Sequence, residues 1–194
     1  PFTQVHINDG FWLPRIEKNR MVYIPSAFKE CEKNGRFDNF AIAGGFKKGE
    51  HRGDFSFDDT DPYKVIEGAS YSLAVKYDPQ LDHYLDSVIN IIAAAQEPDG
   101  YLTTCVTNKC YRLSGWWGHS KWEKLNSHEL YNSGHMYEAA VAHYRATGKR
   151  TFLDVAIKNA DLVCKVFGPG EGQKHVPSGH PIVEMALCKL YKVT

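Results

Sequence analysis

The sequence predicts an all-α protein built from pairs of antiparallel helices. Apolar residues recur at helical spacing through most of the 194 residues, and no segment shows the pattern of a substantial sheet. A partial repeat marks the first helix of each pair, because the same Glu-x-Ala pattern begins at Glu67, Glu138 and Glu184. The loops between the copies differ in length, which disfavours a regular solenoid and favours a ring of helix pairs, an α/α toroid.

Turn and capping residues set the expected limits of each helix. Pro62 suits a first helical turn, Asp78-Pro79 and Pro98-Asp99-Gly100 separate helices, and Gly148 ends one. We expect helices over 15–33 with a kink or break at Pro25, over 62–77, 80–96, 127–147 and 151–167, and a last helix that opens at His180-Pro181. The glycine-rich segment 35–61 and the segment 101–126 are expected to be loops, and a loop as long as the second is usually functional.

Composition restricts the function. The chain is 43% hydrophobic and 24% charged, which is typical of a folded globular protein, and its length suits one domain over residues 1–194. It has 23 basic and 23 acidic residues, so its charge does not favour a nucleic-acid partner. No run of about 18 apolar residues is present, so no membrane partner is expected. Nothing in the sequence indicates the cellular compartment.

The cysteines and the chain ends give two further expectations. The five cysteines are an odd number without a C-x-x-C pair, which predicts free thiols and no zinc site, although Cys105 and Cys110 are close enough in sequence to pair. The chain begins at Pro1 and ends within a helical pattern, so we expect a piece of a longer protein, cut at both ends. The open faces of an incomplete toroid favour homo-oligomers.

Two histidines stand at expected helix starts. His128 follows Asn126 and Ser127, which are good helix-capping types, and His180 directly precedes Pro181. If the two helices are equivalent members of the ring, both histidines point to the same end of it. His128 and His180 are therefore candidate site residues, and an ordinary surface or loop histidine is the alternative for each.

Two residues near His128 are expected to be structural. Glu129 suits the positive end of a helix dipole. His135 lies seven residues after His128, which is on the order of 10 Å along a helix, so the two cannot easily hold one metal ion. We expect His135 to be a buried, hydrogen-bonded histidine.

An acidic group, Asp58, Asp59 and Asp61, precedes one helix. Paired carboxylates act as acid and base on glycosides, and they also bind hard cations. Helix capping and compensation of the helix dipole by Asp61 explain them more simply, and we favour that interpretation.

An aromatic loop contains Trp116, Trp117 and Trp122. Tryptophan faces stack on the C–H faces of sugars, and tryptophan is the largest aromatic side chain. Packing of the loop over the core is an equally good interpretation, so the sequence leaves the role of this loop open.

Several short motifs occur in an order that resembles a known family. They are Gly35-Arg36-Phe37-Asp38-Asn39-Phe40, Phe57-Asp58-Asp59-Thr60-Asp61-Pro62-Tyr63-Lys64, Gln96-Glu97-Pro98-Asp99-Gly100-Tyr101-Leu102, Ser127-His128-Glu129-Leu130-Tyr131 and Gly179-His180-Pro181. With these motifs, about residues 8 to 194 resemble the amino-terminal part of glycoside hydrolase family 127, the β-L-arabinofuranosidase group.

The resemblance implies a fold, a reaction and a cofactor. It implies the first half of an (α/α)6 barrel, in an enzyme that removes β-linked L-arabinofuranose from a glycan with retention. In that family a zinc-bound cysteine is the nucleophile and a glutamate is the acid/base, and a Glu-x-Cys pair and a Cys-Cys pair supply the zinc ligands. Neither pair occurs in residues 1–194, so zinc is expected in the full-length enzyme, with no catalytic residue or metal ligand in this segment.

The resemblance also matches His128 and His180 to sugar-contacting histidines, and it gives the acidic group no assured role. Two other classes of function stay open. One is a helical glycan-binding or scaffold module without catalysis. The other is a different α/α-toroid sugar enzyme, in which Asp58, Asp59 and Asp61 would gain weight. We expect the isolated segment to be catalytically inactive.

Overall fold

Helices make up the fold, as expected. The structure, a computed structural model, describes residues 2–194, and within that range no strand occurs apart from an isolated bridge between Phe167 and Lys174. The longer helices are α1 (Trp12–Lys18), α2 (Ile24–Lys33), α3 (Arg36–Ala43), α4 (Thr60–Val75), α5 (Pro79–Ala94), α8 (Glu129–Thr147), α9 (Thr151–Val166) and α10 (Ile182–Tyr191). Short turns lie between them, namely α6 (Thr104–Thr107), α7 (Ser114–Trp117) and the 3-10 turns Phe2–Gln4, Tyr111–Leu113 and Leu125–Ser127. No helix in this described range is long and apolar enough to cross a membrane.

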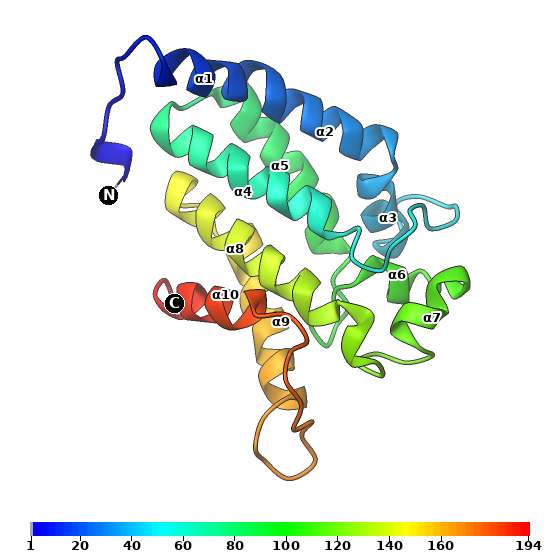
Figure 1. Cartoon of the computed structure of the whole chain (residues 1–194). Coiled ribbons are helices and arrows are strands. Elements are labelled where there is room, and N and C mark those ends of the chain that lie inside the picture. Colours follow the sequence, from blue (N-terminus) through cyan, green and yellow to red (C-terminus); the bar gives the residue numbers. More distant parts are fainter. Residues whose placement is uncertain (1) are drawn as a thin grey trace.

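α8 is the central helix of the molecule (Figure 1). It packs against α4 on one side and against α10 on the other, while α9 packs against both α8 and α5. The helices that carry the repeated Glu-x-Ala pattern, α4, α8 and α10, therefore lie side by side, and α5 and α9 lie behind them (Figure 1). This is the two-layer arrangement that the sequence predicts for part of an α/α toroid.

Local sequence explains where the predicted helices begin and end. Asp78 is the N-cap of α5, and its carboxylate accepts hydrogen bonds from the backbone N–H groups of Gln80 and Leu81 at 3.0 and 3.2 Å. Gly148 ends α8 in the left-handed region, at φ 73°, where a side chain would be strained. The predicted limits of α4, α5, α8 and α9 hold to within two residues.

The first helical segment differs from the prediction. It begins at Trp12, three residues before the expected start, and a π-helical turn over Asn19–Tyr23 connects α1 directly to α2. The expected break at Pro25 is therefore wrong. Proline has no N–H to donate, and the wider turn immediately before it changes the hydrogen-bond register so that the helix continues through it.

Part of the predicted loop 35–61 is also wrong, because Arg36–Ala43 forms α3. Phe37 and Phe40 are three residues apart, on one helix face, and both are buried. A helix of eight residues is only marginal in water, so its stability depends on packing against α5. Such packing has no local signature in a segment rich in glycine and charge.

Gly134 sets how closely α10 approaches α8. A Cβ added there would lie 2.8 Å from Ile182 Cγ2 and 2.9 Å from the backbone nitrogen of Val183. We expect Gly134→Ala to lower the free energy of unfolding by about 2 kcal/mol, because α10 must move away. Gly68→Ala on α4 is the matched control, since nothing lies within 4 Å of the added methyl group. It should raise the free energy of unfolding by about 0.5 kcal/mol. Urea unfolding of both variants measures the difference, and equal effects at the two positions would contradict the close approach.

Candidate sugar-binding site

The starts of α8 and α10 meet at Tyr131. Its ring centroid lies 5.7 Å from that of His128, 4.5 Å from that of His180 and 4.6 Å from that of His135. The sequence indicated His128 and His180 through two separate helix starts, and the structure places both against one aromatic ring. Sequence reasoning missed Tyr131, although its position three residues after His128 puts the two side chains on the same helix face.

His128 has an unusual backbone conformation. It lies in the left-handed region, at φ 64° and ψ 18°, which few residues other than glycine adopt. Such strain is concentrated at functional sites. Its Nδ1 lies 2.8 Å from the carbonyl oxygen of Asn126. Because a carbonyl oxygen only accepts, Nδ1 carries the proton, and Nε2 is the acceptor of the neutral ring.

His180 is exposed and has the opposite arrangement of its ring nitrogens. Its Nδ1 accepts a long hydrogen bond of 3.4 Å from the backbone N–H of Ile182, so Nε2 carries the proton in the neutral ring. The Ser178 hydroxyl lies 2.8 Å from the His180 carbonyl oxygen and 2.6 Å from Glu184 Oε1, and it holds the loop against α10. The two histidines thus offer one acceptor and one donor, which suits a ligand with several hydroxyl groups.

Aromatic side chains extend the cluster beside His128. The ring centroid of Phe57 lies 4.9 Å from that of His128, and the centroid of Trp116 lies 6.1 Å from it. Trp116 is 37% exposed, whereas Trp117 and Trp122 are buried in the core. Packing over the core therefore applies to Trp117 and Trp122. Trp116 lies beside His128, and for this residue sugar stacking stays a prediction.

Lys64 is the cation of this cluster. Its Nζ donates hydrogen bonds to the Tyr131 hydroxyl at 2.9 Å and to Thr60 Oγ1 at 3.0 Å.

Burial, with smaller contributions from the charges of Lys64 and His180, lowers the pKa of His135 to about 4. His135 is half-buried and its Nδ1 has no hydrogen-bond partner, so the expected buried, hydrogen-bonded histidine is wrong. Its ring packs against the Tyr131 ring instead.

The three carboxylates of the acidic group bind side chains and backbone of α3 and α6. Asp58 Oδ1 lies 3.1 Å from Arg36 Nη2, and Asp61 Oδ2 accepts a hydrogen bond from Arg36 Nε at 2.9 Å. Asp59 accepts from the backbone N–H and the hydroxyl of Thr104 at 2.7 and 2.5 Å, and its burial raises its pKa to about 7. Asp61 lies in the first turn of α4 as expected, but no side chain caps this helix. The simpler interpretation therefore needs correction, because these carboxylates mainly hold α3, α4 and α6 together.

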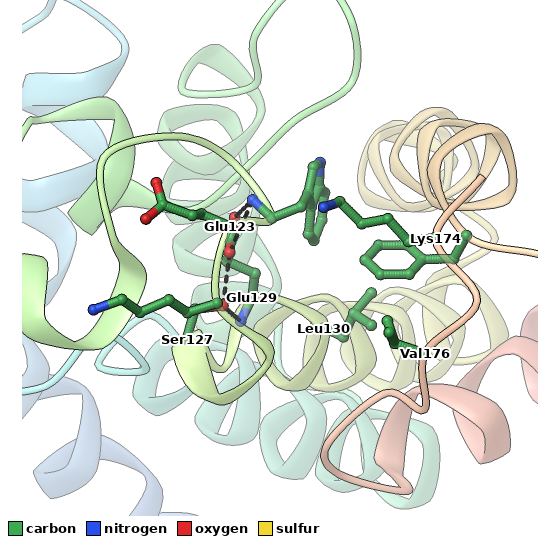
Figure 2. A pocket seen from close by; sticks show the side chains of 9 residues that line it. Glu123, Ser127, Glu129, Leu130, Lys174 and Val176 are labelled. Atoms are coloured by element: carbon green, nitrogen blue, oxygen red, sulfur yellow. Dashed lines mark hydrogen bonds between the residues drawn. The ribbon is translucent and has the colours of Figure 1, made fainter. Parts of the chain in front are cut away.

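Glu129 is buried at the start of α8 (Figure 2). Its carboxylate accepts hydrogen bonds from the Tyr101 hydroxyl at 2.5 Å, the Ser127 hydroxyl at 2.6 Å and the backbone N–H of Trp122 at 2.9 Å. Burial raises its pKa, although these hydrogen bonds act in the opposite direction. Glu129 therefore does more than complement the helix dipole. It connects the loop 101–127 to the start of α8, from which His128 projects.

Glu129 also lines a pocket of about 190 Å³ (Figure 2). Its lining combines the loop before α8, α8 itself and the segment that leads towards His180: Trp122, Glu123, Lys124, Ser127, Glu129, Leu130, Phe167, Lys174 and Val176. The segment 167–181 therefore borders both this pocket and the histidine cluster.

The cysteines are free thiols, as predicted, and Cys105 does not pair with Cys110. Burial raises the pKa of Cys31 to about 11 and raises that of Cys105 further, whereas a thiolate ligand needs a lowered pKa. Within residues 2–194, one group of three metal-ligating side chains gathers closely enough to hold an ion, and it contains no cysteine: Asp82, Asp86 and His143.

Comparison with known proteins decides the family. The family model described as the β-L-arabinofuranosidase, GH127 catalytic domain, matches residues 4–194. The chain belongs to glycoside hydrolase family 127. This confirms the resemblance that the ordered motifs predicted.

Relatives within or near family 127 agree in sequence and in fold. A non-reducing end β-L-arabinofuranosidase from Bifidobacterium longum is 43% identical over 158 residues, which are 80% of this chain and 23% of that protein. A solved GH127 β-arabinofuranosidase is 52% identical with a TM-score of 0.94, over 100% of this chain and 31% of that one. A GH127 β-L-arabinofuranosidase from Geobacillus stearothermophilus T6 is 41% identical with a TM-score of 0.91, over 98% of this chain and 30% of that one. The chain thus spans less than a third of the length of these relatives.

Proposed function

We propose that His128 and His180 form the sugar-binding side of a retaining β-L-arabinofuranosidase site. One observation carries the proposal: both histidine rings contact the ring of Tyr131. The two histidines stand at the starts of α8 and α10, which pack against each other. Family membership supplies the substrate class, a glycan that carries β-linked L-arabinofuranose.

The roles of the two histidines follow from their ring nitrogens. His128 Nε2 accepts a hydrogen bond from one sugar hydroxyl, and His180 Nε2 donates one to another sugar oxygen. The rings of Phe57, Trp116 and Tyr131 offer apolar faces for the C–H groups of the furanose. These residues position the sugar for attack. Those of their contacts that strengthen in the transition state raise kcat.

The residues of this chain do not fit the thiolate zinc centre that the family implies. The support is the lack of Glu-x-Cys and Cys-Cys pairs in the sequence and the raised pKa of the buried thiols of Cys31 and Cys105. The nucleophile, the acid/base and the zinc ligands of the full-length enzyme then come from outside residues 1–194. The segment alone binds sugar without turnover.

A pair of anomeric substrates tests the proposed activity. The full-length enzyme is expected to hydrolyse p-nitrophenyl β-L-arabinofuranoside and to leave the α anomer intact. Proton NMR should show β-L-arabinofuranose as the first product, because the reaction retains configuration. Residues 1–194 expressed alone should release no arabinose. Turnover by the isolated segment would contradict the placement of the nucleophile, and sugar binding without turnover by the full-length protein would favour a glycan-binding module.

A further inference from the structure

We propose that Asp82, Asp86 and His143 form a binding site for a first-row divalent metal ion of the Mn²⁺ or Zn²⁺ type. Asp82 and Asp86 lie one turn apart on α5, and His143 lies on α8, about four turns after His128. One ligand atom from each of the three side chains lies within 4.8 Å of the other two. Two ligand atoms around one ion, each at about 2.1 Å, lie at most about 4.2 Å apart, so a small side-chain rotation completes the site.

His143 is the observation that points to a missing ligand. It is 1% exposed, and neither ring nitrogen reaches solvent or has a hydrogen-bond partner. A buried polar group in a native protein is normally paired, because leaving it unpaired costs about 1–3 kcal/mol. Burial lowers the pKa of the His143 imidazole, although the carboxylates of Asp86 and Asp82 act in the opposite direction.

The Lys149 ammonium group lies between two of the three proposed ligands. Its Nζ lies 2.7 Å from Asp82 Oδ1 and 2.7 Å from Asp86 Oδ2. This ammonium group neutralises the carboxylates, but it leaves the two nitrogens of His143 without partners. The Lys149 side chain is 35% exposed and stands in the short turn after Gly148, so it can move into solvent. A divalent ion in its place would contact all three side chains.

The donor set selects the class of ion. Two carboxylate oxygens and one imidazole nitrogen suit Mn²⁺, Fe²⁺ and Zn²⁺, whereas Ca²⁺ and Mg²⁺ prefer oxygen ligands alone. The Tyr77 hydroxyl donates a hydrogen bond of 2.8 Å to Asp82 Oδ2, and such outer bonds orient a ligating carboxylate. A bound ion would join α5 to α8 near the turn that leads to α9, so its role is to stabilise the packing of two helix pairs.

Titration with Mn²⁺ tests the site, with free Mn²⁺ measured by its EPR signal. Mn²⁺ is chosen because thiolate-rich zinc centres prefer softer ions, so a zinc site elsewhere in the protein is not counted. We expect one Mn²⁺ per chain in the wild-type protein and at least about tenfold weaker binding in His143→Gln and Asp86→Asn. His83→Gln is the matched control, because His83 is an exposed histidine of α5, and it should bind as the wild type does.

Lys149→Met separates a metal site from an ordinary ion-pair cluster. It removes the competing ammonium group, so we expect Mn²⁺ affinity to rise roughly tenfold and Mn²⁺, but not Mg²⁺, to raise Tm. An ion-pair cluster alone predicts a lower Tm without Mn²⁺ binding. That result would overturn the proposal, as would unchanged Mn²⁺ affinity in Asp86→Asn. Lys149 and Asp86 are both partly exposed, so their variants should fold. They therefore test the metal site even where the buried His143 variant fails to fold.

Discussion

Replacing His128 by alanine is expected to lower kcat/KM of the full-length enzyme on a β-L-arabinofuranoside at least about tenfold, or 1.4 kcal/mol of transition-state stabilisation. The hydrogen bond between Nδ1 and the Asn126 carbonyl oxygen fixes the ring, and it leaves Nε2 as the acceptor for the proposed sugar contact. Alanine removes that acceptor and one face of the cluster around Tyr131. Initial rates at substrate concentrations well below KM measure the effect.

Two controls separate sugar contact from backbone strain at His128. His128→Asn keeps a residue that tolerates φ 64°, so it should retain the wild-type free energy of unfolding while activity still falls. His119→Ala changes an exposed histidine of the preceding loop and should leave kcat/KM unchanged. Wild-type kinetics in His128→Ala would contradict the assignment of this residue.

Glu129→Ala is expected to have the largest effect on stability, with the free energy of unfolding lowered by about 3 kcal/mol. The substitution leaves the Tyr101 hydroxyl, the Ser127 hydroxyl and the backbone N–H of Trp122 buried without their acceptor. Glu123→Ala is the matched control, because its carboxylate also accepts backbone hydrogen bonds in the same loop but is exposed, so water replaces it. Its cost should stay below about 1 kcal/mol. Urea unfolding measures the free energy of unfolding of both variants. Equal losses would contradict the claim that the hydrogen bonds to the buried Glu129 carboxylate stabilise the fold.

The sequence predicts helices well where several local signals agree. Asp78-Pro79 before α5 and Gly148 after α8 coincide with apolar residues at helical spacing, so the limits of these helices follow directly. No such combination of local signals marks α3. Its stability depends on the burial of Phe37 and Phe40 in the folded protein.

The candidate site is predictable only in part. His128 and His180 are found because histidine at a helix start is a local pattern. Lys64 and Tyr131 are 67 positions apart, and nothing in either local sequence shows their hydrogen bond. Arg36 joins Asp58 and Asp61 from a helix that the sequence does not reveal.

The proposed metal site shows the same limit. The sequence predicts no metal ligand in this segment, because the Glu-x-Cys and Cys-Cys pairs are absent. Two aspartates four residues apart on a helix are common in ordinary ion pairs and do not by themselves indicate a metal site. His143 follows Asp86 by 57 positions, and only the packing of α8 against its neighbours brings its ring to the carboxylates.

The imidazole NMR signals of the histidines test the sugar-binding proposal most directly. ¹⁵N-labelled histidine signals, assigned through single His→Gln variants, are recorded while L-arabinose is added. We predict that the signals of His128 and His180 move together with one apparent Kd, while the exposed His83 on α5 stays unchanged. A saturating arabinose concentration that moves neither signal, or that moves only His83, would contradict the conclusion that these two histidines hold the sugar.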